Sequence, residues 1–377
     1  MNAKYNAVII GQTGVGKSSL INYLYGATIA TTGVGKPVTQ NGFHQYDFEI
    51  NDLPVCLFDS WGLEVGKDKQ WMDDLNKEFK KRGVTESADK WFHSAFYCIS
   101  ASSARIQDFD IEIIKRFIEE NYKISVVLTK CDQVSEAVEE DLKKELLSQI
   151  NGLSIISVCS EETKTRIGTS EQFGKEHIEQ QAFSDFFDSL ILRLPLRCQD
   201  LMQKEVNNWS KEKLSDIEKK LGMFGRGDES LEHNIKNSAI EVNKKLSQLM
   251  QIETEKTFKM YGDFANKLGY PPQFSNHSQN ESATFEKKKT LEKGFYDDTG
   301  FFEAVAKTVF FTAVIVPVAV WAAYTSKDET AENLRIYVGD CKKKLNDSIQ
   351  KQVEDLVKML KSLKARATEQ KLLPPVS

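Results

Sequence analysis

A phosphate-binding pattern near the start of the chain constrains its fold more than any other feature. Residues 11–18 read Gly-Gln-Thr-Gly-Val-Gly-Lys-Ser, which fits G-x-x-x-x-G-K-[ST]. An apolar run precedes the pattern at 7–10, and a helix-like run follows it at 18–25. Glycines let a backbone wrap closely around an anion, and loop N–H groups with a helix N-terminus supply partial positive charge. The pattern predicts a nucleoside triphosphate site made by Gly11, Gly14, Val15, Gly16, Lys17, Ser18 and Ser19.

Two of these residues have more specific expected roles. Lys17 is expected to reach the β- and γ-phosphates as a catalytic positive charge, and Ser18 to hold Mg²⁺.

The polar stretch 26–42 is too irregular for a helix or a strand and has the length of a functional loop. In a nucleotide switch, such a loop supplies a threonine that meets Mg²⁺ and the γ-phosphate. Thr39 is favoured because it lies just before the next expected strand at 43–50, with Thr31 and Thr32 as alternatives. A plain surface loop is the competing interpretation.

A D-x-x-G sequence follows the apolar run 55–58, which is typical of a buried strand. The carboxyl ends of strands are where α/β folds place ligands. We therefore expect Asp59 to join the Mg²⁺ shell and the Gly62 N–H to sense the γ-phosphate. The next residue is Leu63, which cannot orient a water molecule as a glutamine does at this point in some GTPases. We expect slow intrinsic hydrolysis, with help from another loop, a partner or a second copy.

The strand expected at 125–128 leads into Thr129-Lys130-Cys131-Asp132. A carboxylate at Asp132 accepts hydrogen bonds from N1–H and the N2 amino group of guanine, and adenine cannot satisfy it. Lys130 is expected to pack its stem along the base, after Thr129. These residues predict GTP and GDP as the ligands, rather than ATP.

Together these motifs resemble the translation-factor-related P-loop GTPases, a class that includes Era-like, septin, dynamin-related and immunity-related members. The Thr129 variant and the 34–39 segment are closest to the Era-like and immunity-related (dynamin-like) ones. The resemblance implies that a loop after the strand at 154–158, expected as the last strand, contacts the guanine. Ser157 and Cys159 take that role here, although Ser157-Val158-Cys159 departs from the usual S-A-K.

The alternation of strands and helices through residue 195 predicts an α/β domain with a doubly wound, mostly parallel sheet. A helix over 178–193 is expected to close it, ended by Pro195. Beyond this point apolar residues recur at three- and four-residue steps, at 201–249 and 345–363. This periodicity is typical of long amphipathic helices in a bundle or coiled coil. The expected division is a GTP-binding domain at 1–195 and an all-α effector domain at 196–377.

The stretch 301–324 has only two charged residues, Glu303 and Lys307, and none from 308 onward. It is at the lower length limit of a membrane-spanning helix and contains Pro317. Insertion in a membrane and burial in the helical bundle are equally weighted interpretations. The second-half resemblance to dynamin-related proteins is one of plan, not of motif.

The six scattered cysteines predict free thiols in a reducing cytoplasm. A net charge of −5 argues against a nucleic acid partner. The sequence thus favours a GTP-hydrolysing switch, peripheral to or inserted in a membrane and activated by homodimerisation of its GTP-binding domains or by a partner. The alternatives are a soluble GTP-controlled scaffold and an Era-like GTPase associated with RNA or the ribosome, both with 301–324 buried.

Overall fold

The computed structural model describes residues 3–26, 43–50, 52–60, 68–164, 169–221, 229–268 and 331–369. The chain divides into two compact units. The first takes in the described parts of Met1–Arg193, Asp263–Pro271 and Leu363–Ser377, and the second those of Leu194–Gly262 and Pro272–Ser362. The first unit therefore also contains two short segments from the second half of the sequence. The expected domain division at 195 stays a prediction.

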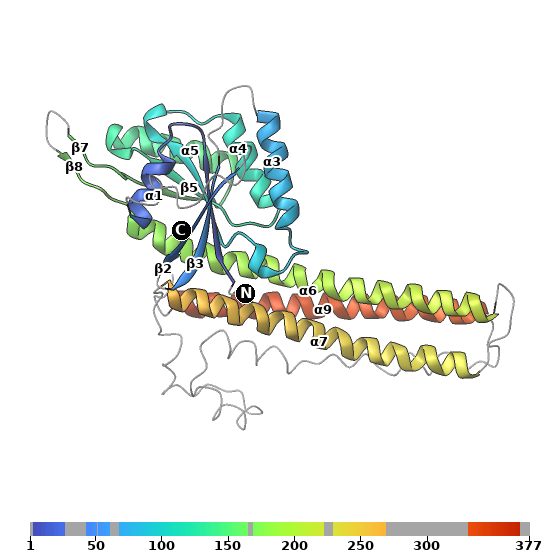
Figure 1. The fold of residues 1–377 in the computed structure, drawn as a ribbon. Coiled ribbons are helices and arrows are strands. Elements are labelled where there is room, and N and C mark those ends of the chain that lie inside the picture. The colour runs from blue at the N-terminus through green and yellow to red at the C-terminus, as the bar shows by residue number, and fades with distance from the viewer. Residues whose placement is uncertain are drawn as a thin grey trace. The chain divides into compact units, whose positions relative to one another are not determined.

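A six-stranded sheet forms the centre of the first unit (Figure 1). Its strands lie in the order β2-β3-β1-β4-β5-β6. The strands are β1 (Tyr5–Gly11), β2 (Phe43–Ile50), β3 (Leu53–Ser60), β4 (Ser94–Ser100), β5 (Ser125–Thr129) and β6 (Ser154–Ser157). Only the β2–β3 pair in this sheet is antiparallel. Every residue of β1, β4 and β5 is buried, as expected for parallel strands covered on both faces. The predicted mostly parallel α/β fold is confirmed.

Helices flank this sheet on both sides, with α1 and α3 on opposite sides in Figure 1. They are α1 (Lys17–Tyr25), α3 (Asp68–Lys81), α4 (Asp108–Glu119) and α5 (Glu136–Gln149), with short 3₁₀ turns η1 (Ala88–Lys90), η2 (Ala101–Ser103) and η3 (Cys131–Gln133). Helices α3 and α4 pack together through Phe79 and Phe117, whose ring centroids are 4.8 Å apart.

The expectation that the strand at 154–158 is the last one is wrong. A two-stranded antiparallel hairpin, β7 (Thr163–Lys164) and β8 (Thr169–Ser170), follows β6. Such short polar strands lack the apolar run that predicts a buried strand.

The expectation that Pro195 ends the closing helix is also wrong. Helix α6 runs from Lys175 to Leu221 with Pro195 inside it. An interior proline removes one helix hydrogen bond and costs about 3 kcal/mol. The side chains around it are buried, among them Leu190, Leu194 and Cys198. Burying a large apolar side chain contributes about 1.5–3 kcal/mol, so this burial outweighs the loss.

The second unit contains most of three long helices: α6 beyond Arg193, α7 (Glu229–Lys267) and α9 (Ala331–Glu369). Helices α6 and α7 are antiparallel, because Arg197 pairs with Glu253 at 3.2 Å, whereas Trp209 Nε1, further along α6, donates to Ser238 Oγ at 3.0 Å, earlier in α7. The predicted apolar positions of α9 are buried in the structure: Leu345, Ile349, Val353, Leu356 and Leu360. The helical second half is confirmed.

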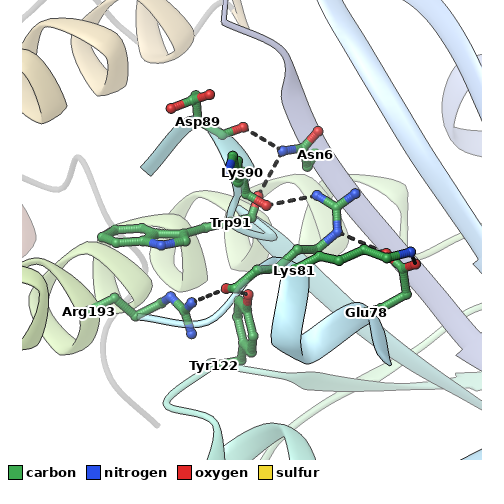
Figure 2. Close-up of polar contacts among 9 residues, drawn as sticks. Asn6, Glu78, Lys81, Asp89, Lys90, Trp91, Tyr122 and Arg193 are labelled. Carbon is green, nitrogen blue, oxygen red and sulfur yellow. Dashed lines mark hydrogen bonds and ion pairs between the residues drawn. The ribbon is translucent and has the colours of Figure 1, made fainter. Parts of the chain in front are cut away.

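A buried arginine fixes α6 within the first unit. The Arg193 side chain has no exposed surface. Its Nη1 donates to the Glu120 carbonyl at 2.7 Å, and its Nη2 to the Arg82 carbonyl. Its guanidinium carbon lies 3.8 Å from the ring centroid of Tyr122 and 4.9 Å from that of Trp91 (Figure 2). Arg193 thereby joins α6 to the chain that leaves α3 and α4.

No helix in the described part of the chain is long and apolar enough to span a membrane. The stretch 301–324 lies outside the described residues.

Candidate functional site

Binding residues predicted from the sequence lie where three parallel strands of the sheet end. Strand β1 ends at Gly11, β3 contains Asp59 as its next-to-last residue, and β5 ends at Thr129. The pairings Ile9↔Asp59, Gly11↔Cys98 and Ser100↔Thr129 place these ends at one edge of the sheet. This is the edge at which open α/β sheets bind ligands.

The phosphate loop follows β1 and has no room for larger residues at its start. A Cβ at Gly11 would lie 2.5 Å from the Cys98 carbonyl oxygen of the neighbouring strand. Lys17 opens α1 and is buried, and its Nζ donates to the carbonyls of Gly11 and Gln12, each at 2.9 Å. Burial lowers the pKa of Lys17, and the charge of Asp59 partly opposes this. A buried ammonium group is thus held across the loop that the sequence assigns to phosphate.

Asp59 and Ser18 fit a divalent cation. Asp59 is buried, and its Oδ1 has no hydrogen-bond partner among the described residues. Burial raises the pKa of its carboxyl group to about 6, although the Lys17 charge lowers it. The Ser18 side chain at the start of α1 is exposed. Oxygen donors of this kind, one of them an unsatisfied carboxylate oxygen, are what Mg²⁺ requires.

The base-recognition sequence is bonded directly to the phosphate loop. The Thr129 hydroxyl donates to the Val15 carbonyl and, at 3.3 Å, to the Ile99 carbonyl. Lys130 Nζ donates to the Gly14 carbonyl at 2.7 Å. The Lys130 side chain therefore reaches the phosphate loop, and its packing along a base stays a prediction. The structure brings the two predicted motifs together although they lie more than a hundred residues apart.

Asp132 lies in η3, the 3₁₀ turn whose first residue, Cys131, follows Lys130. Its Oδ2 accepts a hydrogen bond from Ser170 Oγ at 3.3 Å. Burial raises the pKa of the Cys159 thiol, and the neighbouring Asp132 carboxylate raises it further. Cys159 is therefore close to the predicted guanine-recognition carboxylate.

Two residues predicted to contact the base, Ser157 and Cys159, form hydrogen bonds with other residues of the protein. Ser157 Oγ donates to the Glu139 carboxylate of α5, and the Cys159 N–H donates to the Phe173 carbonyl at 3.2 Å. The Ser19 hydroxyl of α1 donates to the Glu161 carboxylate. The roles of Ser157, Cys159 and Ser19 toward a nucleotide stay predictions.

Thr39 and Gly62 lie outside the described residues, as does Leu63. Sequence reasoning missed Ser170 and Glu161, which lie in the region of the unexpected hairpin. No sequence motif identifies these two residues, because only their contacts in the folded chain link them to the site.

Residues 6–130 match the family model described as a 50S ribosome-binding GTPase. This part of the chain is a P-loop GTPase domain. The match covers the phosphate loop, Asp59 and the start of the base-recognition sequence, which are the groups that the strand ends bring together.

Several proteins share part of this GTPase domain's sequence. The tRNA modification GTPase mss1, mitochondrial, of Schizosaccharomyces pombe is 28% identical over 163 residues, covering 42% of this chain and 33% of that protein. Septin-2 of Drosophila melanogaster is 23% identical over 165 residues, covering 39% of each. The chain thus matches less than half the length of either relative. Toc33 of Arabidopsis thaliana, solved with Mg²⁺ and GMPPNP, has a TM-score of 0.36 at 15% identity and covers 51% of this chain and 87% of that one.

These relatives span several GTPase groups. The narrower assignment to Era-like or immunity-related GTPases stays a prediction.

Proposed function

We propose that this protein binds GTP and GDP with Mg²⁺, hydrolyses GTP, and acts as a molecular switch. The observation that carries the proposal is the joining of the two motifs by the bonds from Thr129 to Val15 and from Lys130 to Gly14. They support a site in which Asp132, two residues after Lys130, selects guanine beside the loop that binds the phosphates. A bound nucleotide would have its base at this carboxylate and its phosphates at the loop.

Each residue has a chemical role in this proposal. Backbone N–H groups of 11–18 and the Lys17 ammonium bind the β- and γ-phosphates, and Asp132 selects guanine. Ser18, Asp59 and Thr39 would hold Mg²⁺, which when bound neutralises charge on the phosphate oxygens. Positioning and charge stabilisation account for most of phosphoryl-transfer catalysis. Leu63 cannot orient the attacking water, so we propose that a second copy or a partner supplies that group.

Nucleotide binding is tested with fluorescent mant-GTP and mant-ATP in the presence of Mg²⁺. We expect the wild type to prefer mant-GTP and Lys17→Ala to lose tight binding. Lys115→Ala, which removes an exposed lysine of α4, is the matched control and should bind normally. Tight binding by Lys17→Ala, or equal affinity for both nucleotides in the wild type, contradicts the site assignment.

Activation by a second copy is tested by phosphate release at increasing protein concentration. A specific activity that rises with concentration supports activation through paired GTPase domains. A constant specific activity assigns the missing group to another loop or to a different partner.

For the helical second half we propose an effector role at a membrane through 301–324, supported by the apolar composition of that stretch. Liposome flotation with GDP or a non-hydrolysable GTP analogue tests it. Flotation that depends on the nucleotide and is lost in a folded Val314→Asp, Val318→Asp variant supports the proposal. Absence of flotation in both states contradicts it and favours burial of 301–324.

A second candidate is a GTPase associated with RNA or the ribosome. The description of the matching family model and the tRNA modification GTPase among the relatives favour it. Co-sedimentation with ribosomes in the GTP-analogue state, absent with GDP, would select this candidate over the membrane switch.

A further inference from the structure

The chain between β6 and α6 does not pass directly into the helix but folds back on itself. We call the described residues 159–164 and 169–175 the strap. Cys159 and Phe173 exchange both backbone hydrogen bonds, at 3.2 and 3.0 Å, and β7 pairs with β8 in the register Thr163↔Ser170. Near the end of the strap, Gly174 has a φ of +94°, and a Cβ added there would lie 2.5 Å from the Ser157 carbonyl oxygen. Only glycine fits the backbone conformation and the space at this position.

One side of the strap contacts Asp132, the residue that we propose selects the base. Strand β8 carries Ser170, and its hydroxyl donates to Asp132 Oδ2 at 3.3 Å. This bond is formed between residues 38 apart in sequence, so the fold of the hairpin is what creates it. A carboxylate has about four acceptor positions. Ser170 therefore occupies one of them, beside the Cys159 thiol, and acceptor positions remain for a base.

The strap is also bonded to the helix that follows the phosphate loop. The Glu161 carboxylate accepts from the Ser19 hydroxyl of α1, and Lys175 Nζ donates to the Tyr23 carbonyl at 3.4 Å. Within the strap, Gln172 Nε2 donates to the Ser160 carbonyl at 2.8 Å. These bonds fix the strap on α1, so Ser170 is presented to Asp132 from an anchored element.

We propose that the strap forms part of the guanine site and that Ser170 is a positioning residue for base selection. Its hydroxyl holds the Asp132 carboxylate in the rotamer in which both oxygens face N1–H and the N2 amino group of guanine. Without this bond the carboxylate turns about its side-chain dihedrals, and its alignment with the amino group is lost first. The proposal rests on the proposed function, because it requires that Asp132 binds guanine.

The test compares the affinities of GDP and of inosine diphosphate, which lacks the N2 amino group. The ratio of the two affinities isolates the bond between that amino group and Asp132. Loss of one hydrogen bond of ordinary net strength changes an affinity about fivefold, so we expect Ser170→Ala to lower the ratio by about that factor. Ser170→Thr keeps the hydroxyl and should restore most of the ratio. Thr169→Ala, at the exposed neighbouring position of β8, should leave it unchanged.

The outcomes separate this inference from the proposed function. An unchanged ratio in Ser170→Ala, with tight GDP binding in the wild type, overturns the role of Ser170 and leaves the GTPase assignment intact. An equal loss of affinity for both nucleotides also overturns it, because a purely structural role weakens both alike. Failure of the wild type to bind GDP overturns the proposed function and this inference together.

Discussion

Replacing the buried Arg193 by methionine tests how α6 is held in the first unit. Methionine keeps most of the apolar volume but removes the guanidinium group. The change eliminates the hydrogen bonds to the carbonyls of Glu120 and Arg82 and the contacts with the rings of Tyr122 and Trp91. Arg82 loses less, since its carbonyl still accepts from the Tyr122 hydroxyl at 2.6 Å.

The magnitude follows from these contacts. Hydrogen bonds to a charged group contribute about 1.5–3 kcal/mol each, and a desolvated cation–π contact about 2 kcal/mol. Relief of the desolvation penalty of a buried cation offsets a large part of that sum. We expect Arg193→Met to lower the free energy of unfolding by about 3 kcal/mol. For a unit of this size that corresponds to a fall in Tm of about 6–12 °C.

Thermal unfolding followed by circular dichroism measures the effect. Arg193→Lys keeps the charge but not the planar fork that serves two carbonyls, so its loss should be about half as large. Arg105→Met, at an exposed position after η2, is the control and should change Tm little. If Arg193→Met and Arg105→Met unfold at the same temperature, the guanidinium does not fix α6 and the argument fails.

Three further predictions concern residues of the first unit. Gly11→Ala should abolish nucleotide binding, because its Cβ would lie 2.5 Å from the Cys98 carbonyl oxygen; unchanged mant-GDP affinity would contradict the tight approach. Burial lowers the pKa of His93 to about 3, below its unfolded value of about 6.5. Its contribution to stability is present above pH 6.5 and is lost as pH falls. His93→Asn keeps an acceptor for the Asn6 N–H but cannot be protonated. Between pH 6.5 and 4 its free energy of unfolding should therefore fall by about 3 kcal/mol less than that of the wild type. Urea unfolding at several pH values measures this, and an equally steep fall in both proteins would refute it. Burial raises the pKa of Asp185 to about 6, so its contribution is present below pH 4 and is lost as pH rises through 6. In the same measurement, the free energy of unfolding of Asp185→Asn should rise by about 3 kcal/mol relative to that of the wild type between pH 4 and 8. A difference between the two proteins that does not change with pH would contradict this prediction.

Local signals in the sequence predicted the sheet well. The strand β2 begins and ends at the expected residues, Phe43 and Ile50, and the strand expected at 125–128 is β5, Ser125–Thr129. Alternating or continuous apolar runs report directly on burial, and burial decides where a strand forms. Apolar runs also predicted where the motifs lie, because each motif follows an apolar run and therefore stands at the end of a strand.

The features that sequence reasoning missed depend on partners far along the chain. Helix α6 continues through Pro195 because the side chains around it are buried, and no local pattern reports that burial. The hairpin after β6 is short and polar, so its strands carry no periodic signal. Arg193 reads as a surface residue in a helix until the carbonyls of Glu120 and Arg82 are placed around it.

The sequence by itself determined the mostly parallel α/β fold and the helical second half, and it predicted the position of the phosphate loop. These depend on short-range patterns: glycine spacing, apolar runs and helical periodicity. The tertiary structure alone decided how the motifs cooperate. It bonded Thr129 and Lys130 to the phosphate loop and brought Ser170 to Asp132. A hydrogen bond requires atoms within about 3 Å, and only the folded chain sets such a distance between residues far apart in sequence.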